Sequence, residues 1–399
     1  MNRRDFLAVS AMLGVGAAVG ACSDDEAGSS PTTTSSAAID TGDSGRFVTI
    51  IGAGAAGMAA GHLLAQRGID FQILEAGPTY GGRIKHTHDF VDFPIALGGE
   101  WLHAREATLG QIVNDESIEI TTRMHGYADD DPYGLVTGTT VGVVEMGRFD
   151  DLKFVGSSWL DFFDEHIVSG IADRMVFDTQ ITHVDYSSDP VTLFDATGHG
   201  WFTDRVIVTV PMKILQDGDI GFVPALPSSH RDALAEANIW TGMKVFLEFT
   251  EAFYPVFTEF IADGELDGQR SYYDAAYGQE SDANVLGLFL VGEPAEPYQA
   301  LDPGDELRDY ILAELDELFD GAASRTYIQH ISQNWANEPF IKAAYLEDNA
   351  FTRIPNALAG TLDDRVYFAG CSYTREPDWS SVHTAVRSAR DAVDELTAR

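Results

Sequence analysis

Residues 46–57 read RFVTIIGAGAAG, and this stretch decides the fold. Its first half, 46–51, is rich in β-branched side chains and predicts a strand. A G-x-G-x-x-G turn follows, and an Ala- and Leu-rich helix then runs to about Arg67. The first glycine permits a tight turn, the second lets a pyrophosphate approach the backbone, and the third lets helix and strand pack closely. The residues of this predicted dinucleotide-binding turn are Gly52, Gly54, Ala56 and Gly57.

A second predicted strand, Asp70 to Leu74, ends at Glu75. An acidic residue at this place accepts hydrogen bonds from the ribose hydroxyls of a dinucleotide, while the amides at the helix start bind its phosphates. A lone glycine-rich turn would be a weak signal. The order strand, turn, helix, strand and acid makes it specific.

Two further glycine pairs follow, in Gly81-Gly82-Arg83 and in Gly98-Gly99-Glu100-Trp101, and Gly82, Glu100 and Trp101 are among the predicted cofactor contacts. With these, the sequence resembles the flavin amine oxidase family, which includes monoamine, polyamine and L-amino-acid oxidases. The resemblance implies that Arg83 binds the phosphates of the flavin nucleotide, for which a forked cation is suited. It also implies that the backbone of the later pair lies close to the isoalloxazine ring, where side chains at Gly98 or Gly99 would clash.

The resemblance covers residues 46–399, with a weaker stretch at about 104–175. It extends through segments 180–184, 204–211, 335–345, 365–370 and 379–382. It implies that the Ile181 backbone contacts the adenine, that Gly370 lets the backbone approach the ribityl-phosphate chain, and that a last helix begins near Ser381. The dipole of that helix would stabilise negative charge on the reduced ring. The predicted FAD contacts in these segments are Ile181, Trp335, Gly370, Ser381 and Val382.

Lys244 and Tyr345 are the residues predicted to serve the chemistry. Lys244 matches the family's lysine that contacts flavin N5 through a water, although a lysine among apolar residues is often a surface group. Tyr345 matches one wall of an aromatic cage over the flavin, or else is a core residue. Val382 stands where the family has the second cage tyrosine, so the cage is at best half built. Ala344 stands where some members carry a cysteine bonded to flavin, so we expect FAD to be held non-covalently.

Composition limits the partners. The chain has 63 acidic and 25 basic residues and a formal net charge of -38, which repels nucleic acid and anionic lipid. The charge would attract a cationic substrate, or it suits a salty environment. The chain has two cysteines and neither a CxxC nor an HExxH pattern, so we predict no metal site.

The N-terminus has the features of an export signal. A twin-arginine pattern at Arg3-Arg4 precedes a short apolar run, and the run ends in a lipobox-like Val19-Gly20-Ala21-Cys22. We therefore expect residues 1–22 to be a signal that leaves Cys22 lipidated, and the small polar residues 23–45 to be a flexible tether. The protein is then exported, extracytoplasmic and attached to the membrane only through the lipid.

The predicted fold class is α/β, a Rossmann-like FAD-binding domain interleaved with an α+β substrate domain. The FAD domain is expected to take 45–104, 172–222 and 340–399, and the substrate domain 105–171 and 223–339, with a helix at Asp305–Phe319. The expected activity is oxidation of a small amine or amino acid to the imine by hydride transfer to flavin N5, with reoxidation by oxygen giving hydrogen peroxide. Two alternatives stay open: a desaturase or dehydrogenase on the same framework, and a non-catalytic ligand-binding lipoprotein.

Overall fold

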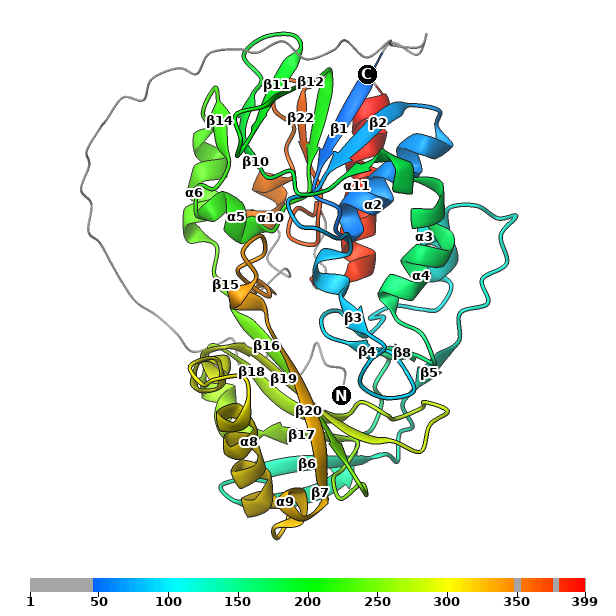
Figure 1. The fold of residues 1–399 in the computed structure, drawn as a ribbon, viewed down its shortest axis with the longest axis vertical. Coiled ribbons are helices and arrows are strands. Elements are labelled where there is room, and N and C mark those ends of the chain that lie inside the picture. Colours follow the sequence, from blue (N-terminus) through cyan, green and yellow to red (C-terminus); the bar gives the residue numbers. More distant parts are fainter. Residues whose placement is uncertain (1–45, 348–352, 376–379, 399) are drawn as a thin grey trace, which may run out of the picture.

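A five-stranded parallel sheet lies at the centre of the upper part of the molecule (Figure 1). The computed structural model describes residues 46–347, 353–375 and 380–398. The strand order is β22 (Val366–Phe368), β13 (Arg205–Val208), β1 (Phe47–Ile51), β2 (Asp70–Leu74) and β9 (Met175–Val176). The two central strands, β1 and β13, are short runs rich in β-branched residues, as expected for parallel strands that are covered on both faces. The predicted start of the fold is confirmed, since β1, β2 and the helix between them lie where the sequence placed them.

Two helices, α2 (Ala55–Gln66) and α11 (Val382–Thr397), pack against each other on one face of this sheet (Figure 1). Small residues let α2 approach the strands, because a Cβ at Gly61 would lie 2.9 Å from the Phe71 ring. The Ser381 hydroxyl caps α11 by accepting a hydrogen bond from the Thr384 amide at 3.3 Å. The predicted start of the last helix is therefore confirmed.

A four-stranded sheet and a group of short helices cover the other side of the parallel sheet. The strands are, in order, β12 (Gly200–Thr203), β11 (Val191–Asp195), β10 (Ile181–Asp185) and β14 (Gly221–Val223). The helices are α5 (Met212–Gln216), α6 (Ser228–Glu236) and α10 (Arg353–Leu358). Their buried side chains form one apolar cluster with strands β13 and β22.

The lower part of the molecule is built on a seven-stranded mixed sheet (Figure 1). Its order is β20 (Tyr327–Asn334), β16 (Gly242–Phe249), β19 (Asn284–Gly292), β18 (Gly268–Asp274), β17 (Phe257–Phe260), β6 (Pro132–Thr137) and β7 (Thr140–Glu145). Helix α8 (Asp305–Leu318) buries Leu307, Ile311 and Leu315 against it. The helix predicted at 305–319 is therefore confirmed to within one residue.

Shorter elements lie within and between the two parts. They are η1 (Gly82–Ile84), β3 (His86–Thr87), β4 (Ile95–Ala96), α3 (Thr108–Val113), β5 (Met124–Gly126), β8 (Leu152–Phe154), α4 (Trp159–His166), β15 (Ile239–Trp240), α7 (Glu296–Gln299), α9 (Ala322–Thr326) and β21 (Tyr345–Leu346). Among the described residues, no helix combines the length and the apolar character that a membrane crossing requires.

The expected domain boundaries differ from the packing at three helices. We assigned 105–171 and 223–339 to the substrate domain, but α3 and α4 bury their apolar faces in the same cluster as α2 and α11. Helix α6 likewise packs beside β13. These helices have one apolar face each, and the nearest uncovered apolar surface belongs to the FAD domain. Only β6 and β7 of the 105–171 segment join the large sheet.

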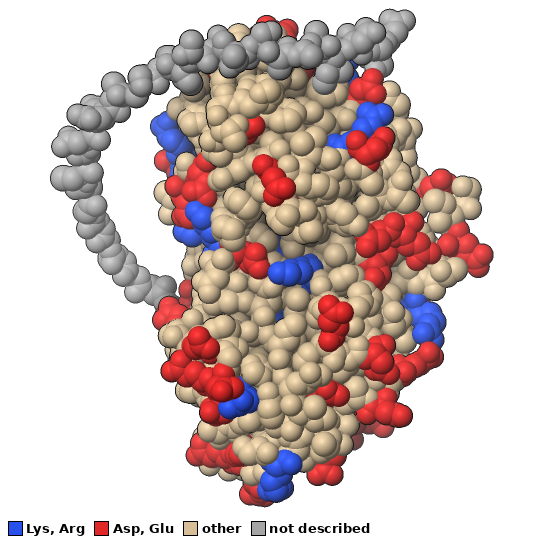
Figure 2. Space-filling view, in the orientation of Figure 1, with Lys and Arg blue, Asp and Glu red and all other residues tan. Residues whose placement is uncertain are grey.

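The surface agrees with the composition. On the face shown in Figure 2, Asp and Glu side chains gather along the right-hand margin, whereas Lys and Arg side chains are scattered. A negative field of this kind concentrates cations near the molecule.

Candidate active site

The glycine-rich turn joins β1 to α2 with a geometry that other residues would not tolerate. Gly52 has φ +102°, which favours glycine. A Cβ at Gly57 would lie 1.9 Å from the Gly52 carbonyl oxygen, so the third glycine lets the helix pass close to the turn. Nothing lies within 4 Å of the Cβ position of Gly54, which faces open space. Gly52 and Gly57 thus take the turn and packing roles that the motif predicts, and the approach of a pyrophosphate to Gly54 stays a prediction.

Glu75 follows β2 and holds the turn in place. Its Oε2 accepts a hydrogen bond from the Ala53 amide at 2.6 Å, and its Oε1 accepts one from the Gly77 amide at 2.8 Å. Burial raises the pKa of the Glu75 carboxyl, although the hydrogen bonds from Ala53 and Gly77 partly oppose this. A carboxylate has about four acceptor positions. Acceptor capacity is therefore left for the ribose hydroxyls that the sequence predicted as its partners.

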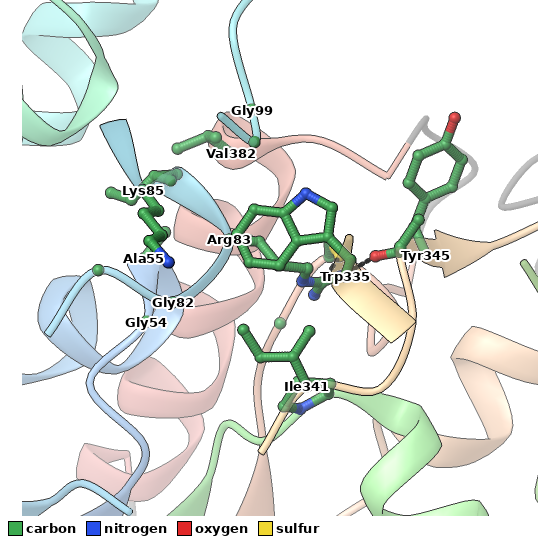
Figure 3. Close-up of a pocket in the computed structure, with 18 of the residues that line it drawn as sticks. Gly54, Ala55, Gly82, Arg83, Lys85, Gly99, Trp335, Ile341, Tyr345 and Val382 are labelled. Atoms are coloured by element: carbon green, nitrogen blue, oxygen red, sulfur yellow. Dashed lines mark hydrogen bonds between the residues drawn. The ribbon is translucent and has the colours of Figure 1, made fainter. Parts of the chain in front are cut away.

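One cavity runs from this turn to the large sheet, with a volume of about 1370 Å³. That exceeds the roughly 300–1,000 Å³ of an ordinary small-molecule site, so the cavity has room for a dinucleotide and a substrate. In Figure 3, Gly54, Ala55 and Gly82 lie on one side of it, and Trp335, Ile341 and Tyr345 on the other.

The structure brings the predicted site residues together around this cavity. It is lined by Gly52, Gly54, Ala56, Glu75, Gly82, Arg83, Gly98, Gly99, Glu100, Trp101, Ile181, Lys244, Trp335, Tyr345, Gly370, Ser381 and Val382. Gly57, predicted as a cofactor contact, does not line it. Its place under the turn makes it a packing residue. Cys22 and Trp379 lie outside the described residues.

Gly98 is required for a reason other than the predicted one. A Cβ there would lie 2.0 Å from the Arg83 carbonyl oxygen and 2.9 Å from the Trp335 ring. The glycine at position 98 therefore allows two protein segments to touch. The sequence had instead predicted that a side chain there would clash with the flavin ring. At Gly99, a Cβ would lie 3.2 Å from a Val382 methyl group, a contact that a small shift relieves.

Arg83 crosses beneath Trp335 (Figure 3). Its guanidinium donates hydrogen bonds to the Ala344 carbonyl oxygen and to Cys371 Sγ, the latter at 3.4 Å. Trp335 Nε1 donates to the Leu97 carbonyl oxygen at 3.1 Å. These bonds join the segments that form the cavity wall, and the contact of Arg83 with the flavin phosphates stays a prediction.

A buried charged cluster lies beside the cavity, where β16 meets the Gly98–Trp101 segment. Lys244 Nζ is 2.8 Å from Glu100 Oε2, and Lys153 Nζ is 3.6 Å from Glu100 Oε1. Tyr273 donates its hydroxyl to Glu100 Oε2 at 2.6 Å. The side chains of Lys244 and Lys153 are 4% and 2% exposed, so each needs a charged or polar partner. Lys153 also donates to the carbonyl oxygens of Asp274 and Ala275.

The pKa shifts in this cluster follow from the number of partners. Burial alone would raise the pKa of the Glu100 carboxyl, but attraction to Lys244 and Lys153 outweighs it and the net pKa is lowered. Burial lowers the pKa of Lys244 and of Lys153, and attraction to Glu100, with Asp274 in the case of Lys153, only partly offsets it. Glu100, predicted as a cofactor contact, thus directs its carboxylate to the lysines and acts on the site through Lys244.

The aromatic side of the cavity also departs from the prediction. Tyr345 on β21 pairs with Trp240 on β15, and their ring centroids are 6.0 Å apart in an edge-to-face arrangement. Both residues line the cavity. The second aromatic ring beside Tyr345 is therefore Trp240, which sequence reasoning missed because it lies far away in the chain.

A histidine and a carboxylate form a second polar pair in the cavity wall. His103 Nδ1 is 2.9 Å from Asp151 Oδ2, and their side chains are 24% and 15% exposed. The sequence placed His103 in the Gly98–His103 segment but gave it no role, and it gave none to Asp151, Lys153 or Tyr273. No local signal links these residues, because the fold alone brings them together.

The turn, the acid and the long cavity define the class of protein: an FAD-dependent oxidoreductase with a Rossmann-like dinucleotide-binding domain. A model of the NAD(P)-binding Rossmann-like domain matches residues 50–115. A model described as flavin containing amine oxidoreductase matches residues 166–397, and the chain belongs to that family. Its cofactor, FAD, is held non-covalently.

Known relatives and structures agree with this assignment. Polyamine oxidase 4 of Oryza sativa subsp. japonica is 22% identical over 438 residues, which cover 88% of this chain and 88% of that protein. Lysine-specific histone demethylase 1B of Mus musculus is 25% identical over 220 residues, 52% of this chain and 25% of that protein. Putrescine oxidase with bound putrescine has the same fold, with a TM-score of 0.72 at 14% identity over 89% of this chain and 99% of that one. Cyclohexylamine oxidase from Brevibacterium oxydans IH-35A superposes with a TM-score of 0.73 at 15% identity, over 88% and 99%.

Proposed function

We propose that this enzyme oxidises a cationic amine to the imine and passes the electrons to oxygen, forming hydrogen peroxide. Bound FAD supplies the hydride acceptor, flavin N5. The protein positions the substrate, removes water from around it and tunes the reactivity of the flavin. The observation that carries the proposal is Lys244, a buried ammonium on the wall of the same cavity that begins at the dinucleotide turn. A cation there favours negative charge that develops on a reduced flavin.

The substrate nitrogen must lose a proton before hydride leaves the adjacent carbon. His103 is suited to accept that proton, because Asp151 holds its Nδ1 and leaves Nε2 as the acceptor. The aromatic rings of Trp240 and Tyr345 flank the approach to the flavin, and the faces of such rings attract a cationic amine. Relatives that are named for polyamine and putrescine oxidation support a cationic substrate, as does the net charge of -38.

Anaerobic mixing of the purified protein with an amine panel tests the proposal. The panel contains putrescine, spermidine, cyclohexylamine and neutral L-amino acids. Loss of flavin absorbance near ~450 nm with a cationic amine supports it, since reduction reports hydride transfer directly. Peroxide release on adding air would support oxygen as acceptor. A flavin that no amine bleaches would favour the non-catalytic alternative, and reduction without reoxidation by air would favour a dehydrogenase.

Replacing Lys244 by Met is expected to slow the reaction of the reduced enzyme with oxygen by roughly 100-fold, the size typical for losing one preorganised electrostatic group. Reduction by the amine should change far less, because Lys244 assists the charge on the ring and not the amine. Stopped-flow absorbance separates the two half-reactions. Lys213→Met, which removes a surface lysine paired with Asp217, is the matched control. Equal slowing of both half-reactions would contradict the assigned role.

We also propose that the protein is exported and attached to the membrane through a lipid on Cys22. The support is the order of twin arginine, apolar run and lipobox in residues 1–22, which lie outside the described residues. In the native host, Cys22→Ala is expected to move the enzyme from the membrane fraction to the soluble fraction, with Ser23→Ala as control. Unchanged membrane association of Cys22→Ala would refute the lipid anchor.

A further inference from the structure

Three side chains from two distant segments meet outside the charged cluster of the active site. His86 and His88 lie at β3, and Asp161 lies in the first turn of α4. His86 Nδ1 is 3.4 Å from Asp161 Oδ2, and His88 Nε2 is 3.2 Å from Asp161 Oδ1. The imidazole rings stand edge to face with centroids 4.6 Å apart. One nitrogen of each ring therefore faces the same carboxylate.

The spacing of these atoms fits the coordination shell of a small metal ion. Zinc binds imidazole nitrogen and carboxylate oxygen at about 2.0–2.2 Å in a tetrahedron, which separates neighbouring ligand atoms by roughly 3.3 Å. The nitrogen–oxygen distances, 3.4 Å from His86 to Oδ2 and 3.2 Å from His88 to Oδ1, each lie close to that value although they involve the two oxygens of one carboxylate, and one donor atom from each of the three residues lies within 4.8 Å of the others. The His88 side chain is more than half exposed, so a small rotation can bring its nitrogen to the same carboxylate oxygen as His86.

The burial of the carboxylate adds to the geometry. Asp161 Oδ2 is shielded from solvent, and its contact among the described residues, with His86 Nδ1 at 3.4 Å, does not form a regular hydrogen bond. A buried acceptor without a hydrogen bond is rare in folded proteins, and a bound ion can compensate it. The Asp161 amide, by contrast, is satisfied by the Ser158 hydroxyl at 3.3 Å.

We propose that His86 Nδ1, His88 Nε2 and one oxygen of Asp161 bind a divalent transition-metal ion of the zinc class. Two imidazoles and one carboxylate suit zinc, cobalt or nickel, whereas calcium and magnesium prefer all-oxygen sites. Water completes the shell on the exposed side of His88. His86 gives up its 2.6 Å hydrogen bond to the Ser158 hydroxyl, which remains the N-cap of α4.

An ion at this place has a structural consequence for the cavity. His86, Lys85 and Leu160 all line the cavity wall, and β3 follows directly on the Arg83 segment. The metal would clamp β3 to α4 and so fix that wall. The sequence predicted no metal site because it has neither a CxxC nor an HExxH pattern. The ligand pairs lie 73 and 75 residues apart, so the fold creates this site.

Calorimetric titration of the FAD-loaded protein with zinc chloride at pH 7.5 tests the proposal. Excess magnesium is present throughout to occupy the acidic surface. One zinc per chain is expected, and His88→Gln and Asp161→Asn should each weaken its binding at least ~10–100-fold, the range for perturbing a metal site. His183→Gln, which removes an exposed histidine at another site, should bind zinc as the wild type does.

Two further measurements make the result decisive. Binding should weaken on acidification, because protons compete with the metal for its ligands. Flavin absorbance and circular dichroism report whether each variant is folded, and the exposure of His88 makes His88→Gln the safe variant. Equal zinc binding in all proteins, or none that survives magnesium, would overturn the proposal. Neither outcome bears on amine oxidation, because the metal is not assigned a part in it.

Discussion

Replacing Glu100 by Gln is expected to lower the free energy of unfolding by about 3–5 kcal/mol at neutral pH, the usual result of removing one partner from a buried ion pair. The loss is large because the single carboxylate compensates both Lys244 and Lys153, whose side chains are almost fully buried. The amide of Gln keeps the shape and can still accept from Tyr273. The loss of stability therefore measures the removal of the negative charge and not a change in side-chain volume.

The pH dependence of this variant has a definite sign. Burial lowers the pKa of both lysines, and attraction to Glu100 raises it again. Without Glu100 the folded chain binds fewer protons than the unfolded chain, in which lysine titrates near about 10.4. Stability of the variant should consequently rise with pH up to that value. In the wild type, attraction to the carboxylate partly offsets the effect of burial on the lysine pKa values, so the same rise should be weaker.

Urea unfolding at several pH values, with the same excess of FAD in every sample, measures the effect. Glu248→Gln is the matched control, because Glu248 lies on the same strand as Lys244 but accepts a hydrogen bond from the neutral Gln329 near the surface. The Glu248→Gln change should alter the free energy of unfolding by no more than about 0.5 kcal/mol. Adding Lys153→Met to Glu100→Gln should restore part of the stability, since one uncompensated ammonium is then gone. If the double variant is less stable than Glu100→Gln, the two lysines do not share the carboxylate.

The sequence predicted those parts of the site that are encoded locally. The Gly52–Gly57 turn, Glu75 at a strand end and the cap at Ser381 each depend on neighbours within a few residues, so their roles follow from short patterns. Their spatial convergence followed from the strand order of a Rossmann-like fold.

The remaining parts depend on contacts between distant segments. Lys153 pairs with Glu100 only because β8 lies beside the Gly98–Trp101 segment, and Trp240 meets Tyr345 only because β15 pairs with β21. The helices α3 and α4 were placed in the wrong domain for the same reason. An amphipathic pattern shows that a helix has an apolar face, but not which surface covers that face.

Replacing Gly54 by Val is expected to give a folded protein that purifies without yellow colour. Nothing lies within 4 Å of the Cβ position, and the backbone at φ -78°, ψ -176° is open to any residue, so the polypeptide itself tolerates the change. The space that the side chain would fill is where the motif brings the pyrophosphate against the backbone. Affinity for FAD should fall at least 100-fold, which is about 3 kcal/mol.

Gly57→Ala should fail in a different way, and the contrast separates binding from folding. Its Cβ would lie 1.9 Å from the Gly52 carbonyl oxygen, so the turn and α2 cannot both keep their places. Gly110→Ala is the control, since its Cβ meets nothing within 4 Å and it lies in α3. Without FAD, the unfolding temperatures of Gly54→Val and Gly110→Ala should be close to that of the wild type. The unfolding temperature of Gly57→Ala should be well below it. A Gly54→Val protein that binds FAD normally would show that the pyrophosphate does not lie against this turn, and the assignment of the cavity would have to be abandoned.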